Sequence, residues 1–296
     1  MARLSAFIQL MRPQQWYKNL IFFTAFIFSK NLANSALYAQ LALGFASLCL
    51  ASSANYAIND ILDMKNDARH PEKKNRPLPS GKIKAGEAYF FALILLIASL
   101  ALAYSVSLAF FAAILLFFTL TQIYSFRAKN IVFADIVFVS TNFVIRAISG
   151  ALAINVVFSP WLVLCSFLLA LFISASKRLG DLLLLGKEAW KYKQVFKYYT
   201  PELLGNVVVA SMAMLLLSYS NYSFLSTSHD DYIMMATIPI AAFLVFRYTY
   251  LLYSRSPITR SPEKVFKDGQ MFFGVALWLA LVLLSLYINH GASLSI

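Results

Sequence analysis

The sequence predicts an all-α polytopic membrane protein, with nine transmembrane helices surrounding a polar cavity that faces the cytoplasm. Three observations lead to this fold class. The 296-residue chain is 60% hydrophobic and 13% charged, about half of the roughly 25% charged residues typical of soluble domains. Apolar stretches recur that are near the ~20 residues needed to cross a bilayer. Cations gather in alternate connecting segments, as expected for loops that stay on the cytoplasmic side.

Each span is an apolar stretch bounded by polar or charged residues, and we expect all nine to belong to a single integral membrane domain, 1–296. In chain order the spans are 18–34, 40–62, 86–104, 108–125, 131–153, 160–177, 203–222, 232–253 and 270–289. Transmembrane strands are excluded, because unpaired backbone cannot cross lipid and no ten-residue alternating pattern is present.

The distribution of charge supports this order when the amino terminus is placed in the cytoplasm. Twenty-two of the 25 Lys and Arg residues then lie on the cytoplasmic side: Arg3, Arg12 and Lys18, seven between 63 and 84, Arg127 and Lys129, six between 177 and 197, and Arg255, Arg260, Lys264 and Lys267. Adding or losing one span would destroy this asymmetry. We therefore expect a multi-pass protein of the cell inner membrane whose active site is on the cytoplasmic side, in the loops 63–85, 178–202 and 254–269.

Two other readings of the composition are excluded. The net charge of +12 is explained by the positive-inside pattern, so no nucleic-acid partner is expected. Cys49 and Cys165 both lie inside apolar segments, which indicates neither a disulfide nor a zinc site.

The most informative segment is 59–81, at the end of the second span. On a helix, Asn59, Asp63 and Asp67 share one face, and Asp60 joins it. Three carboxylates on one face repel each other unless a cation lies among them, and such hard oxygen ligands suit Mg²⁺. The basic residues that follow, Arg69, Lys73, Lys74 and Arg76, would face the same anion. The segment predicts a Mg²⁺–diphosphate site at a membrane surface, against the alternative of a solvated helix end.

Two further sets of cations are candidates for binding phosphate. Lys177, Arg178 and Asp181 fall on one helical turn, which offers two phosphate donors and one metal ligand, or simply topogenic charge. Arg146 lies inside the span 131–153, where an arginine needs an anionic partner or a water-filled cavity. Asp135 and a substrate phosphate are the candidate partners, and a structural ion pair is the alternative.

The motif Asn-Asp-x-x-Asp-x-x-x-Asp, present as Asn59, Asp60, Asp63 and Asp67, resembles that of the UbiA superfamily of intramembrane prenyltransferases, and the resemblance covers essentially the whole chain. The prenyl-diphosphate users carry a second Asp-rich motif after the sixth span, where this chain has only Asp181. It is more similar to the decaprenyl-phosphate phosphoribosyltransferase branch. The shared positions are Arg12, Pro13, Gln15, Trp16, Lys18 and Asn19, then His70, Pro71, Lys73, Arg76 and Pro77, then Arg146, Ala147 and Gly150, then Lys177 and Arg178, and finally Pro262, Glu263 and Asp268.

The resemblance implies transfer of 5-phosphoribose from phosphoribosyl diphosphate to a polyprenyl phosphate within the lipid bilayer, with Mg²⁺ held by Asp60, Asp63 and Asp67. Arg146 would join these as a catalytic residue. The implied substrate-binding residues are Lys18, Asn19, Asn59, Lys73, Arg76, Lys177, Arg178, Asp181 and Tyr198. A prenyltransferase with an isoprenyl diphosphate donor and an aromatic or lipid acceptor is the alternative, and a lipid-phosphate transporter is a third class. The sequence leaves the oligomeric state open, a homo-oligomer included.

Overall fold

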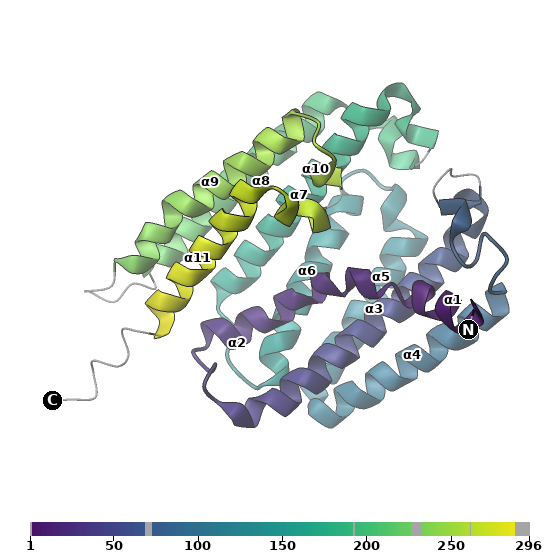
Figure 1. The fold of residues 1–296 in the computed structure, drawn as a ribbon, viewed down its shortest axis with the longest axis horizontal. Coiled ribbons are helices and arrows are strands. Elements are labelled where there is room, and N and C mark those ends of the chain that lie inside the picture. The colour runs from purple at the N-terminus through teal and green to yellow at the C-terminus, as the bar shows by residue number, and fades with distance from the viewer. Residues whose placement is uncertain (1, 69–72, 192, 226–231, 261, 288–296) are drawn as a thin grey trace. The chain divides into compact units, whose positions relative to one another are not determined.

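The computed structural model describes residues 2–68, 73–191, 193–225, 232–260 and 262–287, and these ranges contain helices and no strand (Figure 1). The chain divides into two compact units. Unit 1 comprises Met1–Phe26, Leu32–Lys129 and Val144–Phe158, and unit 2 comprises Ile27–Asn31, Asn130–Phe143 and Ser159–Ile296. Helix α6 (Ala134–Ala153) contributes its first half to unit 2 and its second half to unit 1.

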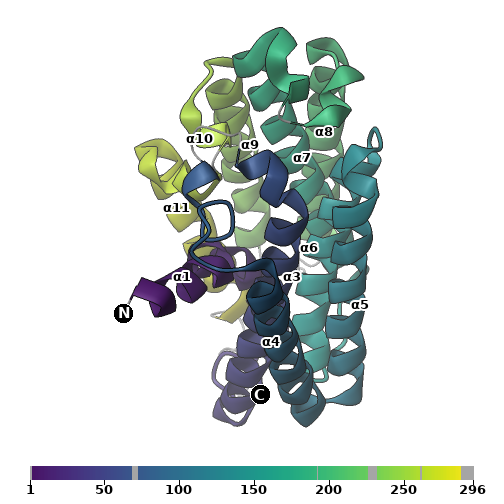
Figure 2. The ribbon, with the colours of Figure 1, turned by 90° about the vertical axis from the view of Figure 1, so that its right-hand side faces the viewer.

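Unit 1 is built around the long helix α3, which packs against α4 and α5. Its elements are α1 (Ala2–Met11), η1 (Pro13–Phe23), the start of α2 (Thr24–Phe28), η2 (Ser35–Leu37), α3 (Tyr38–Asp67), η3 (Lys73–Asn75), α4 (Ala85–Val106), α5 (Leu108–Phe126) and the start of η4 (Ala128–Asn130). Figures 1 and 2 show α3 and α4 side by side.

Small residues let α3 and α4 approach closely. Ala51, Ala54 and Ala57 of α3 are fully buried, and small residues recur on the buried face of α4. Ser47 and Ser99 each donate a hydroxyl hydrogen bond to the other's carbonyl oxygen, at 2.8 and 2.7 Å. Small residues and exchanged hydroxyl bonds are what hold helices together where lipid removes the hydrophobic driving force.

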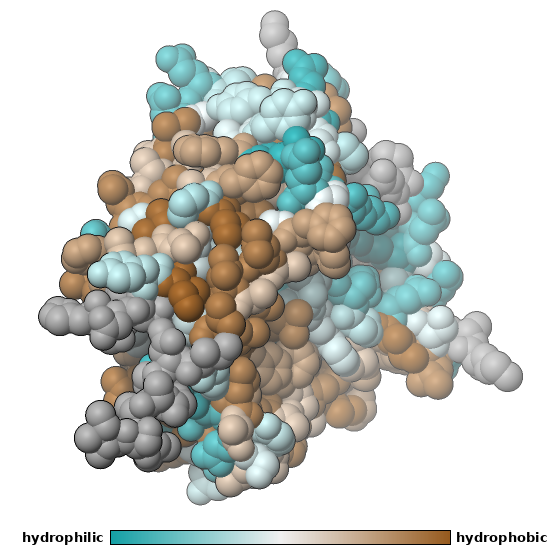
Figure 3. All heavy atoms as spheres, turned by 60° about the vertical axis from the view of Figure 1, so that its left-hand side comes forward, coloured by the Kyte–Doolittle hydropathy of each residue, from teal (hydrophilic) through white to brown (hydrophobic). Residues whose placement is uncertain are grey.

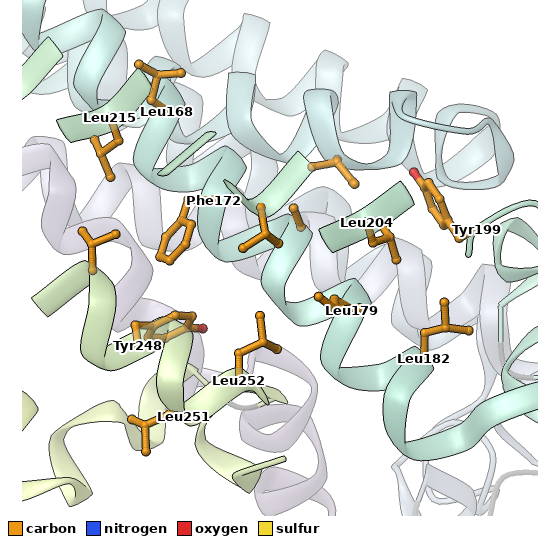
Figure 4. Packing of buried hydrophobic residues seen from close by; sticks show 14 of the residues in the cluster. Leu168, Phe172, Leu179, Leu182, Tyr199, Leu204, Leu215, Tyr248, Leu251 and Leu252 are labelled. Carbon is orange, nitrogen blue, oxygen red and sulfur yellow. The ribbon is translucent and has the colours of Figure 1, made fainter. Parts of the chain in front are cut away.

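Unit 2 is a helical group with an apolar core. Its elements are α7 (Pro160–Leu185), η5 (Gly186–Lys191), η6 (Gln194–Lys197), α8 (Pro201–Leu225), α9 (Ile233–Tyr253), α10 (Pro257–Arg260), η7 (Pro262–Lys267) and α11 (Gly269–Tyr287). Figure 4 shows leucines of α7, α8 and α9 around Phe172 and Tyr248, whose ring centroids are 5.4 Å apart. Helix α7 begins at Pro160 because Ser159 caps it, accepting a hydrogen bond from the Trp161 N–H.

The all-α membrane fold is confirmed, but the count of nine spanning helices is not. Eight helices of the described chain are long and apolar enough to cross a membrane, and apolar side chains cover broad areas of the surface in Figure 3. The predicted first span, 18–34, is instead the 3₁₀ segment η1 followed by the five-residue α2. Side-chain hydrogen bonds tie η1 to α3: Trp16 donates to Ser53, and Asn19 donates to Cys49. Its backbone also packs directly on Gly150.

Candidate active site

The predicted acid face is present at the end of α3. This helix continues to Asp67, so Asn59, Asp60, Asp63 and Asp67 all lie on its last turns. Asp60 and Asp67 are 3% and 4% exposed, which is rare for carboxylates unless they are paired. The burial therefore requires counter-charges, and the surrounding segments supply them.

Basic side chains from two segments contact the buried carboxylates. Arg12, which follows α1, forms an ion pair with Asp60. The Nη1 atom of Arg76 lies 3.4 Å from Asp60 and 2.5 Å from Asp67, so one guanidinium bridges two acids. Lys73 Nζ lies 3.6 Å from Asp67. Lys73 and Arg76 were expected to face a bound anion, and in the structure they contact the motif carboxylates.

The third carboxylate, Asp63, is contacted by Lys129 of η4, the short segment that follows α5. Lys129 Nζ lies 2.8 Å from Asp63, and the Asn59 amide donates to the other oxygen at 3.1 Å. We call these residues together the acid cluster: Asp60, Asp63, Asp67, Asn59, Arg12, Lys73, Arg76 and Lys129. All of them belong to unit 1.

The loop after η3 is folded so that Arg76 is held in place. The Arg76 N–H donates to the Lys73 carbonyl, and the Ile83 N–H donates to the Pro77 carbonyl. Leu78 and Ile83 are buried in an apolar cluster with residues of α1, α3 and α4. Arg69, His70 and Pro71, which the sequence also indicated, lie outside the described residues.

The carboxylate oxygens of the acid cluster are suitable ligands for Mg²⁺. In the structure, however, these carboxylates form ion pairs with basic side chains. Three carboxylates on successive turns are the hard oxygen ligands that Mg²⁺ uses together with substrate phosphates. Within the described residues, no group of three or more His, Cys, Asp or Glu is arranged to hold a metal. Each of Asp60, Asp63 and Asp67 is instead turned toward a basic side chain. These three are therefore the residues that would hold the ion.

The predicted partner of Arg146 is corrected by the structure. Arg146 is 8% exposed, and its guanidinium lies over the Phe117 ring, 4.8 Å from the centroid. Asp135 is eleven residues earlier on the same helix α6, a rise of roughly 16 Å at 1.5 Å per residue. Asp135 therefore cannot pair with Arg146, and it is engaged elsewhere.

Asp135 is the centre of a second cluster, in unit 2. Its carboxylate is fully buried and accepts hydrogen bonds from Arg178 Nε at 2.7 Å, Lys193 Nζ at 2.6 Å and the Tyr199 hydroxyl at 2.6 Å. The Tyr199 oxygen in turn accepts from the Phe133 N–H at 2.8 Å. We call Asp135, Arg178, Lys193 and Tyr199 the Asp135 cluster. It joins the start of α6, the end of α7 and the η5–η6 segment.

Burial, together with the neighbouring polar groups, changes the pKa of two groups in this cluster. Burial, and then the neighbouring charge of Arg178, lower the pKa of Lys193 to about 7, although Asp135 and Asp181 act in the opposite direction. Burial and its hydrogen bond to Asp135 raise the pKa of Tyr199, so this phenol stays protonated.

The remaining predicted substrate-binding residues have different environments. Asn19 is 1% exposed, and its amide donates to Cys49 and accepts from Ser52, which are the contacts of a packing residue. Tyr198 is 65% exposed, and its neighbour Tyr199 is the tyrosine that enters the Asp135 cluster. Lys18 Nζ lies 5.8 Å from the centroid of its neighbour Tyr17's ring.

The structure describes the residues predicted after the sixth span, Lys177, Arg178 and Asp181, and one side chain, Asp268, of the motif before the last span. Lys177 and Asp181 are half-buried on α7, one helical turn apart as expected, and Arg178 between them reaches Asp135. Asp268 forms a bidentate pair with Arg247 and caps α11 by accepting from the Met271 N–H. The side chains of Pro262 and Glu263 lie outside the described part of the chain.

Sequence reasoning did not single out several residues that the structure brings into these clusters: Arg12, Lys129, Lys193 and Tyr199. Arg12 and Lys129 were recognised only as topogenic charge or as part of a motif. Spacing along the chain could not reveal the contacts, because Asp63 and Lys129 are 66 positions apart. Asp135 did carry a signal, since an acid at the start of a membrane span must have a partner.

Comparison with known proteins agrees with this architecture. Residues 19–275 match the UbiA prenyltransferase family. The chain is 27% identical to a decaprenyl-phosphate phosphoribosyltransferase from Corynebacterium glutamicum, over 95% of this chain and 86% of that protein. It is also 27% identical to one from Mycolicibacterium smegmatis, over 96% and 93%.

Solved structures share the fold. A UbiA homolog from Archaeoglobus fulgidus, bound to GPP and Mg²⁺, superposes with a TM-score of 0.73 at 21% identity, over 94% of this chain and 99% of that chain. A digeranylgeranylglyceryl phosphate synthase superposes with a TM-score of 0.68 at 19% identity, over 97% and 99%. The family match spans most of the sequence, and the fold and the acid motif agree with it. This chain belongs to the UbiA prenyltransferase family of intramembrane transferases.

Proposed function

We propose that this protein transfers 5-phosphoribose from phosphoribosyl diphosphate to a polyprenyl phosphate, with release of diphosphate. Both relatives described above are named decaprenyl-phosphate phosphoribosyltransferase, and the chain matches them over nearly its whole length. Such a donor is soluble and highly anionic, whereas the acceptor is anchored in lipid. The cation distribution supports donor entry and reaction on the cytoplasmic side of the cell inner membrane.

The observation that carries the choice of donor is the composition of the Asp135 cluster. Members of the family that use isoprenyl diphosphates carry a second Asp-rich motif in the loop after the sixth predicted span. Here Arg178 and Lys193 share one buried carboxylate. A ribose 5-phosphate linked to a diphosphate has more anionic groups than an isoprenyl diphosphate has. A site for it should therefore have basic residues where the isoprenyl diphosphate users have the acids of the second motif. Lys177 and Arg178 are the proposed phosphate ligands, with Lys193 beside them.

The acid cluster is suited to holding a diphosphate. Its basic residues, Arg12, Lys73, Arg76 and Lys129, contact the motif carboxylates. Four cations are therefore available beside these carboxylates to bind phosphate oxygens. Bound Mg²⁺ would supply neutralisation of the charge that develops on the leaving diphosphate. Arginine and lysine side chains held in this way stabilise the same charge and orient the donor.

The reaction needs no strong general base. An oxygen of the polyprenyl phosphate, already anionic at neutral pH, forms a bond to the anomeric carbon of the ribose. The bond from that carbon to the diphosphate oxygen breaks, its electron pair leaves with the diphosphate, and the anomeric carbon is inverted. The residues of this chain therefore bind, orient and compensate charge. Arg146, which is buried with its guanidinium over the Phe117 ring, is proposed to orient one of the phosphates.

The test is transfer of label into lipid. Purified protein in lipid nanodiscs is incubated with Mg²⁺, phosphoribosyl diphosphate labelled in its 5-phosphate, and polyprenyl phosphates of several lengths. We expect label in the organic extract, and none with the Asp63→Asn variant. Label that stays in water, together with consumption of geranylgeranyl diphosphate and an aromatic acceptor, would instead establish the prenyltransferase alternative.

A further inference from the structure

We propose that Asn55 and Gln122 form a recognition site for a hydroxyl group of the donor's sugar, and so select a ribosyl donor over an isoprenyl one. The inference rests on the proposed function and adds to it the residues that read the sugar. Neither residue belongs to the acid motif. Both lie in unit 1, Asn55 on α3 and Gln122 on α5.

The two amides contact each other and leave two polar atoms unpaired. Gln122 Nε2 donates to Asn55 Oδ1 at 2.5 Å. The other amide atoms, Asn55 Nδ2 and Gln122 Oε1, are buried and have no hydrogen-bond partner among the described residues. Asn55 as a whole is 2% exposed. Buried amide groups are costly when unpaired, so a pair of them side by side indicates a missing partner.

This conclusion does not depend on which end of each amide group is the nitrogen and which is the oxygen. Reversing both amides turns the contact into a bond from Asn55 to Gln122. One donor and one acceptor then still remain unpaired, with their places exchanged. The site therefore offers one N–H and one carbonyl oxygen in either assignment.

An alcohol is the group that satisfies both atoms at once, because a hydroxyl accepts one hydrogen bond and donates another. An ionised phosphate oxygen only accepts, so it would leave the amide carbonyl unpaired. An isoprenyl chain does neither, so it would leave both atoms unpaired. The pair is thus complementary to a sugar hydroxyl and unfavourable for a hydrocarbon donor.

The position of the pair relative to the acid cluster agrees with this assignment. Asn55 precedes Asn59 by one helical turn and Asp60 by five residues, a rise of roughly 7.5 Å along α3. In phosphoribosyl diphosphate the anomeric carbon is bonded directly to the diphosphate. A sugar ring whose diphosphate lies at Asp60 can therefore reach the next turn of the helix. The acid cluster is made mostly of charged side chains, which suit a diphosphate. The neutral amide of Asn55, which contacts that of Gln122, lies about one helical turn before it along α3, where the neutral sugar hydroxyls are expected.

The experiment compares donors that have and lack single hydroxyls. Label transfer to polyprenyl phosphate is measured with phosphoribosyl diphosphate and with its 2-deoxy and 3-deoxy analogues. The proteins are the wild type, Gln122→Met, Gln122→Glu and Thr119→Val. Met keeps the length of the side chain without the amide, and Glu retains an acceptor. Thr119 is an exposed residue of α5 whose hydroxyl donates to the Leu115 carbonyl, and it serves as the matched control.

For one of the two hydroxyls, we expect its removal to lower kcat/KM of the wild type and of Thr119→Val by roughly tenfold or more. Removal of the same hydroxyl should change kcat/KM of the Gln122→Met variant by less than about twofold, because this variant has already lost the contact. Gln122→Glu should recover part of the discrimination. Thermal unfolding of each variant checks that it is folded, and Asn55→Leu provides a second disruption if Gln122→Met unfolds.

Two results would overturn the proposal while leaving the function intact. Equal penalties for the deoxy donors in wild type and Gln122→Met would show that the amides do not contact the sugar. Uniform losses with all donors would show that the pair binds water or supports packing. A wild type that transfers no label from phosphoribosyl diphosphate would instead refute the proposed function itself.

Discussion

Gly150 of α6 lies directly against the backbone carbonyl of Phe22, so closely that a Cβ at this position would be 1.8 Å from the carbonyl oxygen. No side-chain adjustment relieves that contact, because the opposing atom belongs to the backbone. Gly150→Ala must displace η1 from α6, and we expect a loss of about 1–3 kcal/mol in the free energy of unfolding. Thermal unfolding in a fixed detergent measures it.

The matched control for Gly150 is Gly86→Ala, in the first turn of α4, where a Cβ would meet nothing within 4 Å. That variant should be neutral or slightly stabilised, since Ala favours the helix over Gly. Equal unfolding temperatures for the two variants would contradict the close contact with Phe22.

The role of the acid cluster is tested at Asp63. Asp63→Asn keeps the side-chain shape and the neighbouring Asn59, but it removes the charge opposite Lys129. We expect turnover to fall at least about a hundredfold and a higher Mg²⁺ concentration to be needed for half-maximal rate, as for a lost metal ligand. Transfer of labelled phosphoribose across a Mg²⁺ series measures both. Glu87→Gln, an acid of α4 paired with Arg3, is the control. Full wild-type activity in EDTA would refute the metal role.

The Asp135 cluster should contribute strongly to stability. Asp135→Asn leaves Arg178 and Lys193 without the buried carboxylate that they share, and removing one partner of a buried ion pair costs about 3–5 kcal/mol. Tyr199→Phe removes one hydroxyl from the same network and should cost about 1–3 kcal/mol. Unfolding temperatures measure both losses. Tyr198→Phe, at an exposed neighbouring position, should change nothing, and an equal effect at both tyrosines would contradict the network.

Donor binding should weaken as the pH rises through neutrality. The pKa of Lys193 is lowered from 10.5 to about 7, so Lys193 loses its positive charge near pH 7 in the folded protein. Between about pH 7 and 10.5 the unfolded chain binds the extra proton, so this group's contribution makes stability rise with pH there. The affinity for an anion instead falls as the pH rises, because the anion binds better to the protonated lysine.

We expect the Kd for phosphoribosyl diphosphate to increase roughly tenfold between pH 6.5 and 8.5, relative to the variant Lys193→Met, since one proton is linked to binding. Lys193→Met is the reference because the donor's own phosphates titrate equally in all variants. Lys193→Arg stays charged, so its pH profile should run parallel to that of Lys193→Met. Parallel pH profiles for wild type and Lys193→Met would exclude Lys193 from donor binding.

Membrane orientation is tested by cysteine labelling in a background with Cys49 and Cys165 replaced by Ala. Asn75 and Asn155 are exposed and are separated by three predicted spans, α4, α5 and α6. In intact cells we expect an impermeant maleimide to label Asn155→Cys, and to label Asn75→Cys only after permeabilisation, because the cation-rich segment stays inside. Labelling of both from outside would refute the topology.

Composition and local pattern were sufficient for the membrane class, for eight of the nine predicted spans and for the acid face of α3. The long helix through Asp67 follows from continuous apolar sequence that ends in polar residues. The first predicted span is not confirmed. Hydropathy measures transfer to lipid, and it does not report the 3₁₀ geometry of η1 or the hydrogen bonds of η1 with Ser53 and Cys49. The second predicted span was located correctly, but its helix extends five residues further than the sequence indicated.

What the sequence by itself determined is the chemistry that is local in the chain: which residues are apolar enough to enter lipid, and which acids share a helical face. Tertiary structure alone decided the pairing of charges. Arg76 bridges Asp60 and Asp67, Lys129 reaches Asp63, and Asp135 pairs with Arg178 rather than with Arg146. The physical reason is range. Helical periodicity acts over a few residues, whereas a buried carboxylate is satisfied by whichever cation the fold brings within about 4 Å, at any separation along the chain.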